Sequence, residues 1–310
     1  MLRDRAAILF NPAAGKGAAR GKKERLERFL RKWAVRYDFI FTQSADDLRT
    51  QTRDSAGRYR ALVGAGGDST LQIMADELAK CGADVELGFI PLGSSNDIAR
   101  EFGLIDLENA CRILKRGKTR KIDLGAVHHQ DRLLHYFVGQ TNIGLGVRVN
   151  RYVEEFALRW PPLASFQSLA GTLGVFRAYR RREVPLFLSV RAEDRESRGR
   201  FILASFNNIR FWASGRILNP SARPDDGFLD GCLIEECSFL RLTRLAALAR
   251  RGRLARAPEA AFLVAPAFFI SSECEFDVQV DGEIIGGYAT PRLFRDIRVS
   301  AVPGKLRLIC

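Results

Sequence analysis

The sequence predicts two domains: an N-terminal doubly wound α/β domain over residues 1–125 and a C-terminal antiparallel β-sandwich domain over residues 126–310. Three observations favour this fold class. The chain has 310 residues, more than one ordinary core holds and enough for two domains of roughly 100 to 200 residues each. Up to Gly125, short apolar runs alternate with amphipathic stretches. Beyond Gly125, strand-like runs are separated by Gly and Asp-Gly turns.

The first domain is predicted to alternate strands with helices. Apolar runs typical of buried strands lie at residues 6–10, 38–41, 60–63 and 86–90, and amphipathic stretches typical of helices lie at 21–35, 45–56, 70–80 and 96–102. Strands separated by helices pair in parallel and form a layered sheet. Because ligands of such sheets bind beyond the carboxyl ends of the strands, we expect a site there.

The second domain is predicted to be rich in antiparallel strands. Strand-like runs lie at residues 134–138, 186–192, 201–206, 228–235, 268–270, 276–280 and 297–302, and two helical stretches interrupt them at 151–182 and 239–256. We place the domain boundary near Gly125 and leave open that the last strands return to the first domain.

Charge and cysteine usage narrow the class of protein. The net charge of +13 favours a polyanionic partner, which can be nucleic acid, anionic lipid or a nucleotide phosphate. The six cysteines form no CxxC pair, so we expect reduced thiols in the cytoplasm and no zinc cage. There is no charged-then-apolar leader, and the charge-free run at 161–176 is shorter than the ~20 apolar residues of a spanning helix, so we expect a soluble protein.

A glycine-rich turn at residues 64–70 follows the third predicted strand. Glycines let backbone N–H groups approach an anion, and the following helix N-terminus favours a phosphate. Asp68 would repel that phosphate unless a cation bridges the two, as in magnesium-dependent phosphoryl transfer. The turn therefore indicates kinase chemistry rather than dinucleotide binding. The alternative is structural, because Ser69 and Gln72 also fit a capping box.

Three further turns lie at the same predicted sheet edge or at the end of the domain. Residues 11–17 do not match a Walker A loop and also suit an ordinary strand-to-helix turn. Residues 91–100 gather hydroxyl, amide and acid groups suited to a nucleotide and its metal, although Ser94 and Asp97 also fit a capping box. Asp123 is an isolated acid near the domain end.

Together these segments resemble the bacterial diacylglycerol kinase family of lipid kinases, which is related to sphingosine kinases and more distantly to NAD kinases. The family has six ordered motifs, and this chain matches them over nearly its whole length at residues 11–15, 66–70, 91–100, 121–125, 225–230 and 281–283. The resemblance implies an active site in the cleft between the two domains and a need for ATP and magnesium.

The resemblance also implies roles for individual residues. The expected ATP contacts are Asn11, Gly15, Thr42, Gly66, Gly67, Asp68, Ser69, Thr70, Ser94 and Asn96. The expected catalytic set is Glu283, which accepts the hydroxyl proton, Asp281 beside it, and Asp68, Asp97 and Asp123 around magnesium. A second, structural magnesium is expected at Asp226, with the backbone carbonyls of Arg223 and Phe228.

Two points stay open from the residues themselves. Asp281 and Glu283 face the same side if the chain is extended, but Asp281-Gly282 also suits a hairpin turn. The family usually has Gly where Ser69 stands; if Ser69 caps the helix with ordinary φ, the change is benign, and Ser69→Gly should leave phosphorylation intact or raise it.

A lipid acceptor implies contact with a membrane surface, and two basic stretches suit an anionic bilayer. Four arginines at residues 177 and 180–182 follow Phe166, Leu169, Leu173 and Phe176, and Arg241, Arg244 and Arg251 flank a helix carrying Leu242, Leu245 and Ala249. The alternative for either helix is a solvated basic face over an apolar face packed on the core.

We therefore expect a cytoplasmic lipid kinase, peripheral to the inner face of the membrane, that acts on a diacylglycerol-like lipid and binds no nucleic acid. A homodimer stays open. The alternatives are an NAD kinase-like enzyme or a catalytically inactive nucleotide or lipid sensor.

Overall fold

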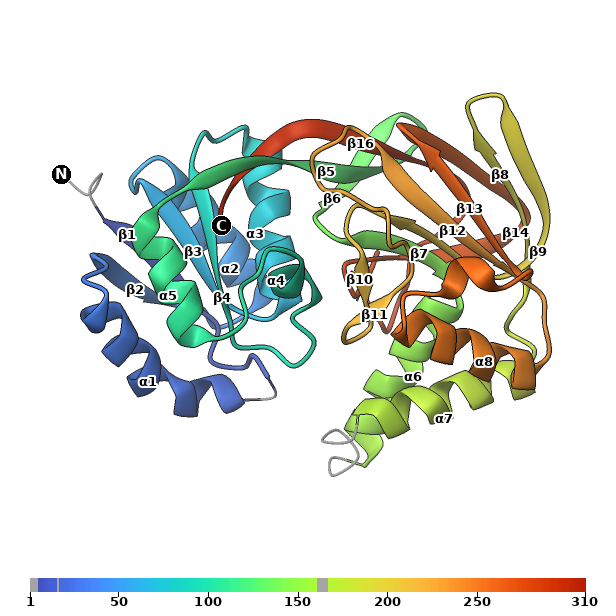
Figure 1. The fold of residues 1–310 in the computed structure, drawn as a ribbon, viewed down its shortest axis with the longest axis horizontal. Coiled ribbons are helices and arrows are strands. Elements are labelled where there is room, and N and C mark those ends of the chain that lie inside the picture. Colours follow the sequence, from blue (N-terminus) through green and yellow to red (C-terminus); the bar gives the residue numbers. More distant parts are fainter. Residues whose placement is uncertain (1–4, 16, 161–166) are drawn as a thin grey trace.

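The computed structural model describes residues 5–15, 17–160 and 167–310, and it contains two parts that long strands join (Figure 1). Lys16 in the first turn and Phe166 in the first basic stretch lie outside the described residues. None of the helices in the described ranges is both long enough and apolar enough to cross a bilayer.

The N-terminal part holds four parallel strands in the order β2-β1-β3-β4, which confirms the predicted α/β layer. The strands are β1 (Ala6–Phe10), β2 (Tyr37–Phe41), β3 (Ala61–Gly66) and β4 (Glu86–Pro91), and the helices are α1 (Ala18–Lys32), α2 (Ala45–Ala56), α3 (Asp68–Cys81), α4 (Asp97–Glu101) and α5 (Leu107–Arg116). Helices α1 and α5 lie on one side of the sheet and α2 and α3 on the other (Figure 1).

The largest differences from the prediction in this part concern the start of α1 and the presence of α5. Helix α1 begins at Ala18 rather than residue 21, because Gly17 takes a φ of 88° and starts the helix directly after the first turn. The sequence analysis missed α5, although Asp106 caps it by accepting a hydrogen bond from the Asn109 N–H at 2.8 Å and Gly117 ends it with a φ of 61°.

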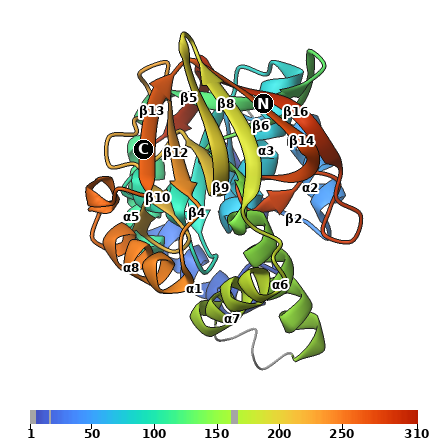
Figure 2. The ribbon, with the colours of Figure 1, turned by 90° about the vertical axis from the view of Figure 1, so that its right-hand side faces the viewer.

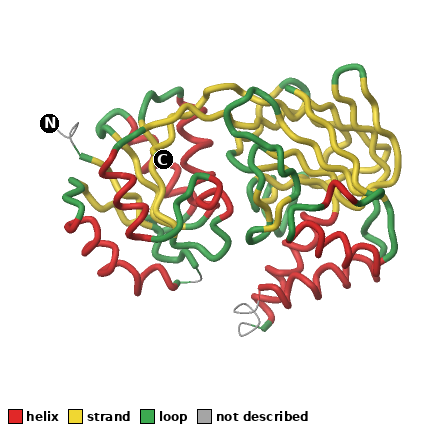
Figure 3. Tube along the Cα trace, viewed as in Figure 1, coloured by secondary structure: helices red, strands yellow, loops and turns green. Residues whose placement is uncertain are grey.

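The C-terminal part is antiparallel and curved, which confirms the sandwich class (Figures 2 and 3). Its strands are β5 (Thr119–His129), β6 (Arg132–Phe137), β7 (Gln140–Gly144), β8 (Leu186–Ala192), β9 (Arg195–Asn207), β10 (Phe211–Trp212), β11 (Arg216–Ile217), β12 (Leu229–Glu235), β13 (Ala260–Ala265), β14 (Ala267–Val280), β15 (Glu283–Ile284) and β16 (Leu293–Ile309). The two strands predicted at 268–270 and 276–280 are one strand, β14, whose pairing with β16 shifts register between Ser271 and Phe276.

The predicted long helices are each divided. Residues 151–182 contain parts of α6 (Leu145–Arg159) and α7 (Gln167–Arg180), and residues 239–256 contain α8 (Phe239–Arg250) and the 3-10 turn η3 (Leu254–Arg256). These helices gather at one end of the sandwich, below the strands in Figure 1. Their inner faces form a core of their own, which includes Tyr152, Leu242 and Leu245.

Strands β5 and β16 run through both parts. Strand β16 pairs antiparallel with β14 and β5, and near its end Arg307 and Leu308 pair in parallel with β4. Gly125, our proposed boundary, lies inside β5, and a Cβ there would lie 1.9 Å from the Phe137 ring. The C-terminal strand therefore fixes how the two sheets meet.

Candidate active site

The predicted phosphate turn lies where β3 and β4 end side by side, since Gly66 pairs with Pro91. A Cβ on Gly93 would lie 2.6 Å from the Gly67 Cα, and one on Gly66 would lie 2.2 Å from the Thr70 hydroxyl. Real side chains do not tolerate such distances, so both positions require glycine. The turns at 64–70 and 91–100 are thus packed backbone to backbone.

The first turn joins the same edge. The Asn11 Nδ2 donates to the Thr70 hydroxyl at 3.2 Å, and the Asn11 Oδ1 accepts from the Ala13 N–H at 3.0 Å. Gly15 takes a φ of 59°, with its Cα hydrogen side facing the Leu92 carbonyl, where a Cβ would lie at 2.7 Å. The structure therefore brings the first three predicted turns together.

Asp68 caps the next helix. Its carboxylate accepts the backbone N–H of Asp97 at 3.0 Å and that of Ile98 at 3.2 Å, at the N-terminus of α4. Burial and the negative charge of Asp97 raise the pKa of Asp68 to about 6. Asp68 thus holds a desolvated negative charge beside another acid.

Asp97 links α4 to the C-terminal part. Its carboxylate accepts the N–H groups of Ser214 at 2.9 Å and Gly215 at 2.7 Å, in the turn between β10 and β11. Burial raises the pKa of Asp97, and these two donors oppose the rise. The side chain that we assigned to magnesium thus also holds a turn whose residues 213–215 all have positive φ.

Asp123 holds a loop before β12 and an irregular stretch of β16. Its two carboxylate oxygens accept the N–H groups of Gly227 and Gly304, both at 2.7 Å. The buried Asn208 side chain donates to the Asp123 carbonyl at 2.9 Å. In the structure both oxygens of the Asp123 carboxylate therefore accept hydrogen bonds from backbone N–H groups.

Asp281 binds the turn before β7. Its carboxylate accepts the N–H groups of Val138 at 2.7 Å, Gly139 at 2.9 Å and Gln140 at 2.7 Å. Burial raises the pKa of Asp281 to about 7 against the effect of these three donors, and the charge of Asp68 adds to the rise.

The Asp281-Gly282 pair is a two-residue hairpin turn, which confirms the structural alternative. Asp281 has a φ of 46° and Gly282 a φ of 99°, and Val280 pairs with Glu283 across the turn. The chain is not extended here, so the premise that Asp281 and Glu283 face the same side is wrong. The exposed Glu283 carboxylate instead accepts the Ser69 hydroxyl at 2.8 Å.

Both capping boxes are wrong. Gly67 is the N-cap of α3, and the Gln72 side chain donates to the Tyr136 carbonyl at 3.3 Å. Asn96, with a φ of 51°, is the N-cap of α4 and makes no side-chain cap. Ser69 lies within the first turn of α3 and does not have a positive φ. Its backbone is therefore ordinary, as expected, although the residue is not the helix cap.

The remaining residues expected to contact ATP differ in whether their polar groups are exposed or already hydrogen-bonded. The Thr42 hydroxyl is buried and donates to the Phe10 carbonyl at 3.2 Å, whereas Ser94 is exposed. The Asn96 Nδ2 donates to the Gly93 carbonyl at 2.9 Å, and its buried Oδ1 has no partner in the part of the chain that is described. A buried amide oxygen without a hydrogen-bond donor is uncommon in folded proteins.

The expected structural metal site lies in a folded loop. The Asp226 carboxylate accepts the Phe228 N–H at 3.1 Å, and Asp225 pairs with Arg120 and, at 3.6 Å, with Arg223. Asp226 is exposed, so its other oxygen is open to a cation. The assignment of a second magnesium here stays a prediction.

The residues expected to hold the catalytic magnesium fit such a site in part. Across the described ranges, no three His, Cys, Asp or Glu side chains form a metal cage. Magnesium needs only one or two carboxylates beside substrate phosphates. Asp97 raises the pKa of Asp68 and Asp68 raises that of Asp281, so this junction concentrates negative charge that a cation would offset. Asp68 is the carboxylate best suited to that cation.

The apolar side chains of the two basic stretches differ in their exposure to solvent. In α7, Leu169, Leu173 and Phe176 are exposed, together with Leu158 and Trp160 at the end of α6. In α8, Leu242, Leu245 and Ala249 are buried in the core, so the alternative of a core-packed apolar face holds for that helix.

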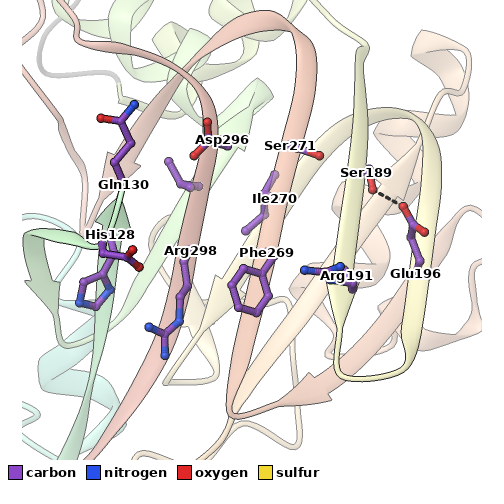
Figure 4. Close-up of a pocket in the computed structure, with 12 residues that line it drawn as sticks. His128, Gln130, Ser189, Arg191, Glu196, Phe269, Ile270, Ser271, Asp296 and Arg298 are labelled. Carbon is purple, nitrogen blue, oxygen red and sulfur yellow. Dashed lines mark hydrogen bonds between the residues drawn. The ribbon is translucent and has the colours of Figure 1, made fainter.

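Two hollows lie in the C-terminal part. One, of about 440 Å³, lies between α6 and the segment after β15 and is lined by Arg148, Tyr152, Leu158 and Tyr288 among others. The other, of about 370 Å³, lies on the sheet face, where Arg298 and Arg191 flank Phe269 (Figure 4). No predicted site residue lines the second hollow.

Sequence reasoning missed several residues that build the site. Asn208 donates to both the Asp123 and Val138 carbonyls at 2.9 Å, and the Tyr288 hydroxyl donates to the Gly282 carbonyl at 2.8 Å. The only signal for Asn208 was an Asn pair that ends an apolar strand, and Tyr288 had none.

Comparisons with known proteins agree with this arrangement. Residues 5–127 match the diacylglycerol kinase catalytic domain, and residues 139–310 match the YegS C-terminal NAD kinase beta sandwich-like domain. A Pseudomonas aeruginosa protein named "Probable lipid kinase YegS-like" is 29% identical over 312 residues, which cover 97% of this chain and 92% of the relative. A Staphylococcus epidermidis diacylglycerol kinase is 26% identical over 290 residues, 92% of this chain and 87% of the relative.

The fold is similar to a solved structure as well. A diacylglycerol kinase from Bacillus anthracis superposes with a TM-score of 0.71 over 99% of this chain and 96% of that chain, at 14% sequence identity.

Proposed function

Since this chain belongs to the bacterial diacylglycerol kinase family of lipid kinases, and is thus a phosphotransferase with an alcohol group as acceptor, we propose that it moves the terminal phosphate of ATP onto the hydroxyl of a diacylglycerol-like lipid. The observation that carries the proposal is the position of Glu283. Its carboxylate lies 2.8 Å from the hydroxyl of Ser69, a residue of the phosphate turn, although 214 positions separate them.

The phosphate turn would bind the nucleotide. No side chain caps the N-terminus of α3 at Gly67, and the positive end of the helix dipole lies at the same place. Glycine at positions 67 and 93 lets the two turns approach each other with no side chain between them. The buried Asn96 Oδ1, which has no partner among the described residues, lies in the second of these turns.

Glu283 would act as the base. It accepts the proton of the lipid hydroxyl while that oxygen forms a bond to the γ-phosphorus, the bond to the β–γ bridging oxygen breaks, and ADP leaves. Asp281 does not share this role, because its carboxylate is buried against the Val138–Gln140 backbone. Instead Asp281 fixes the turn that precedes β7.

Asp68 would hold magnesium, with Asp97 close enough to add to the negative field. When bound, the cation neutralises charge on the transferred phosphate. Asp97 would act on the site mainly by ordering the turn at 214–215, and Asp123 by ordering the loop at 227 and the stretch of β16 at 304.

The acceptor would enter from the side of α6 and α7. The hollow of about 440 Å³ adjoins the turn that carries Glu283, because Tyr288 lines the hollow and also binds the Gly282 carbonyl. The exposed apolar residues of both helices lie beyond it and suit insertion into a cytoplasmic membrane face. The neighbouring arginines suit anionic lipids.

The test is a radiolabelled phosphate transfer assay. Purified protein, ATP and magnesium are incubated with diacylglycerol, monoacylglycerol, phosphatidylglycerol, sphingoid or undecaprenol acceptors in mixed micelles, with an NAD arm. Label in a lipid supports the proposal, label in NADP supports the NAD kinase alternative, and no label with any acceptor supports an inactive sensor.

Glu283→Gln tests the base. We expect it to abolish turnover, a loss of at least about 100-fold, because general-base catalysis contributes on this order. ATP binding measured by calorimetry should stay unchanged. Glu24→Gln, an exposed glutamate on α1, is the matched control. Turnover retained in Glu283→Gln would remove this residue from the role.

A further inference from the structure

The side chain of Glu283 has one bonding partner within the described residues, the Ser69 hydroxyl at 2.8 Å. The backbone beside Glu283 is held firmly, since the Gly282 carbonyl accepts from Tyr288 at 2.8 Å and from the Gln279 side chain at 2.9 Å. The carboxylate itself is exposed. Among the described residues, Ser69 is thus the hydrogen-bond donor that orients this carboxylate.

This contact depends on a side-chain hydroxyl at position 69. Glycine usually stands at the position of Ser69 in the motif discussed above, and glycine has no hydroxyl to donate. Ser69 causes no backbone strain, because it lies inside the first turn of α3 with ordinary φ. The hydroxyl is thus an addition that the fold accommodates. Because Ser69 does not cap the helix, the expectation that Ser69→Gly is benign no longer applies, and loss of the hydroxyl should lower phosphorylation.

We propose that Ser69 is a positioning residue that holds the Glu283 carboxylate against the phosphate turn. Its hydroxyl occupies Oε1 and leaves Oε2 for the proton of the acceptor. A free glutamate loses considerable rotamer freedom when it is fixed for catalysis, and the Ser69 bond supplies that ordering before substrate binds. The inference rests on the proposed function, which makes Glu283 the base.

The kinetic test compares Ser69→Ala, Ser69→Thr and the control Thr50→Ala, which removes an exposed hydroxyl from α2 far from the junction. We expect Ser69→Ala to lower kcat about three- to tenfold, in line with the net contribution of one solvent-exposed hydrogen bond, with the KM for ATP within about twofold of wild type. Ser69→Thr keeps the hydroxyl and should recover most of the loss. An unchanged or raised kcat in Ser69→Ala, or failure of threonine to recover it, would overturn the proposal.

A structural test separates this inference from the proposed function. Crystals of wild type should show Glu283 in one conformer on Ser69, and crystals of Ser69→Ala should show it in several. Wild-type Glu283 turned away from Ser69 would overturn the inference even if lipid is phosphorylated. If Glu283 is ordered on Ser69 but no lipid is phosphorylated, the proposed function fails, and the catalytic role of Ser69 fails with it.

Discussion

At the residue scale, the acids of the site bind backbone N–H groups, and each binds a different segment. Asp68 holds α4, Asp97 holds residues 214–215 and Asp281 holds residues 138–140. A carboxylate has about four acceptor positions, so these bonds leave room for a cation at Asp68. Each of these aspartates therefore fixes one segment of the site, and the Asp68 carboxylate also keeps acceptor positions for a cation.

If Asp68 holds magnesium as proposed, the binding of magnesium-ATP should depend on pH. Burial and Asp97 raise its pKa to about 6, so the side chain is ionised above that pH and protonated below it. A protonated carboxyl does not bind a cation, so affinity for magnesium-ATP should fall as pH drops below 6, by up to about tenfold per pH unit.

The measurement is calorimetry of magnesium-ATP binding between pH 5 and 8. ATP itself takes up a proton in part of this range, so the comparison is with Asp68→Asn, which should bind weakly and lack the additional pH dependence. Parallel curves for wild type and variant would show that Asp68 does not hold the metal.

At the element scale, helix α4 connects the phosphate turn to the C-terminal part. Asp68 caps its start, Asp97 binds the turn between β10 and β11, and Glu101 pairs with Arg210 at 3.0 Å. A helix of five residues has little stability of its own, so these contacts order it.

Asp97→Ala tests this connection without metal or nucleotide. The change leaves the N–H groups of Ser214 and Gly215 without their acceptor, which costs about 1–3 kcal/mol. We expect a lower Tm and faster trypsin cleavage after Arg216, measured by mass spectrometry.

Asp54→Ala, at an exposed position of α2, is the control and should match wild type. Asp97→Asn keeps one acceptor and should lose less stability. If Asp97→Ala is as stable and as resistant as wild type in the absence of magnesium, the side chain serves the metal rather than the turn.

At the scale of the whole molecule, the site exists only where the two parts meet. Strands β5 and β16 run through both parts, and the buried Asp76 of α3 accepts hydrogen bonds from His135 at 3.0 Å and from the Tyr136 N–H at 2.9 Å on β6. Burial raises the pKa of Asp76, but these donors and Lys80 outweigh it and lower the pKa. Helix α3 is therefore held at both ends, by Asp76 on β6 and by Ser69 on Glu283.

The proposed membrane contact is also tested at the scale of the whole molecule. Leu169 is 51% exposed and Leu173 is 40% exposed on α7. The double variant Leu169→Glu/Leu173→Glu should weaken sedimentation with vesicles at least about tenfold, because two apolar side chains no longer enter the bilayer.

The control for this prediction is Ile105→Glu, which changes an 82% exposed aliphatic residue in the N-terminal part and should leave vesicle binding unchanged. Vesicles with and without phosphatidylglycerol test the arginines, since each basic residue near an anionic surface contributes about 1 kcal/mol. Binding that ignores both the variant and the lipid charge would contradict a docking face on α6 and α7.

The sequence by itself determined the features that depend on local pattern. The four parallel strands, the antiparallel sandwich class and the glycine turns could all be predicted, because periodicity of 2 or 3.6 residues and the need for glycine are properties of neighbouring residues. The Asp281-Gly282 hairpin also belongs to this group. The family motifs placed the expected residues in order along the chain.

Only the tertiary structure decided what the side chains bind. Ser69 and Gln72 fit a local capping box, yet they bond to Glu283 and Tyr136, because partners from distant segments satisfy their polar groups once the two parts meet. The same holds for Asp97, Asp123 and Asp281, whose N–H donors lie more than 100 residues away. Local pattern carries no information on such pairs, since they exist only after β5 and β16 bring both sheets together.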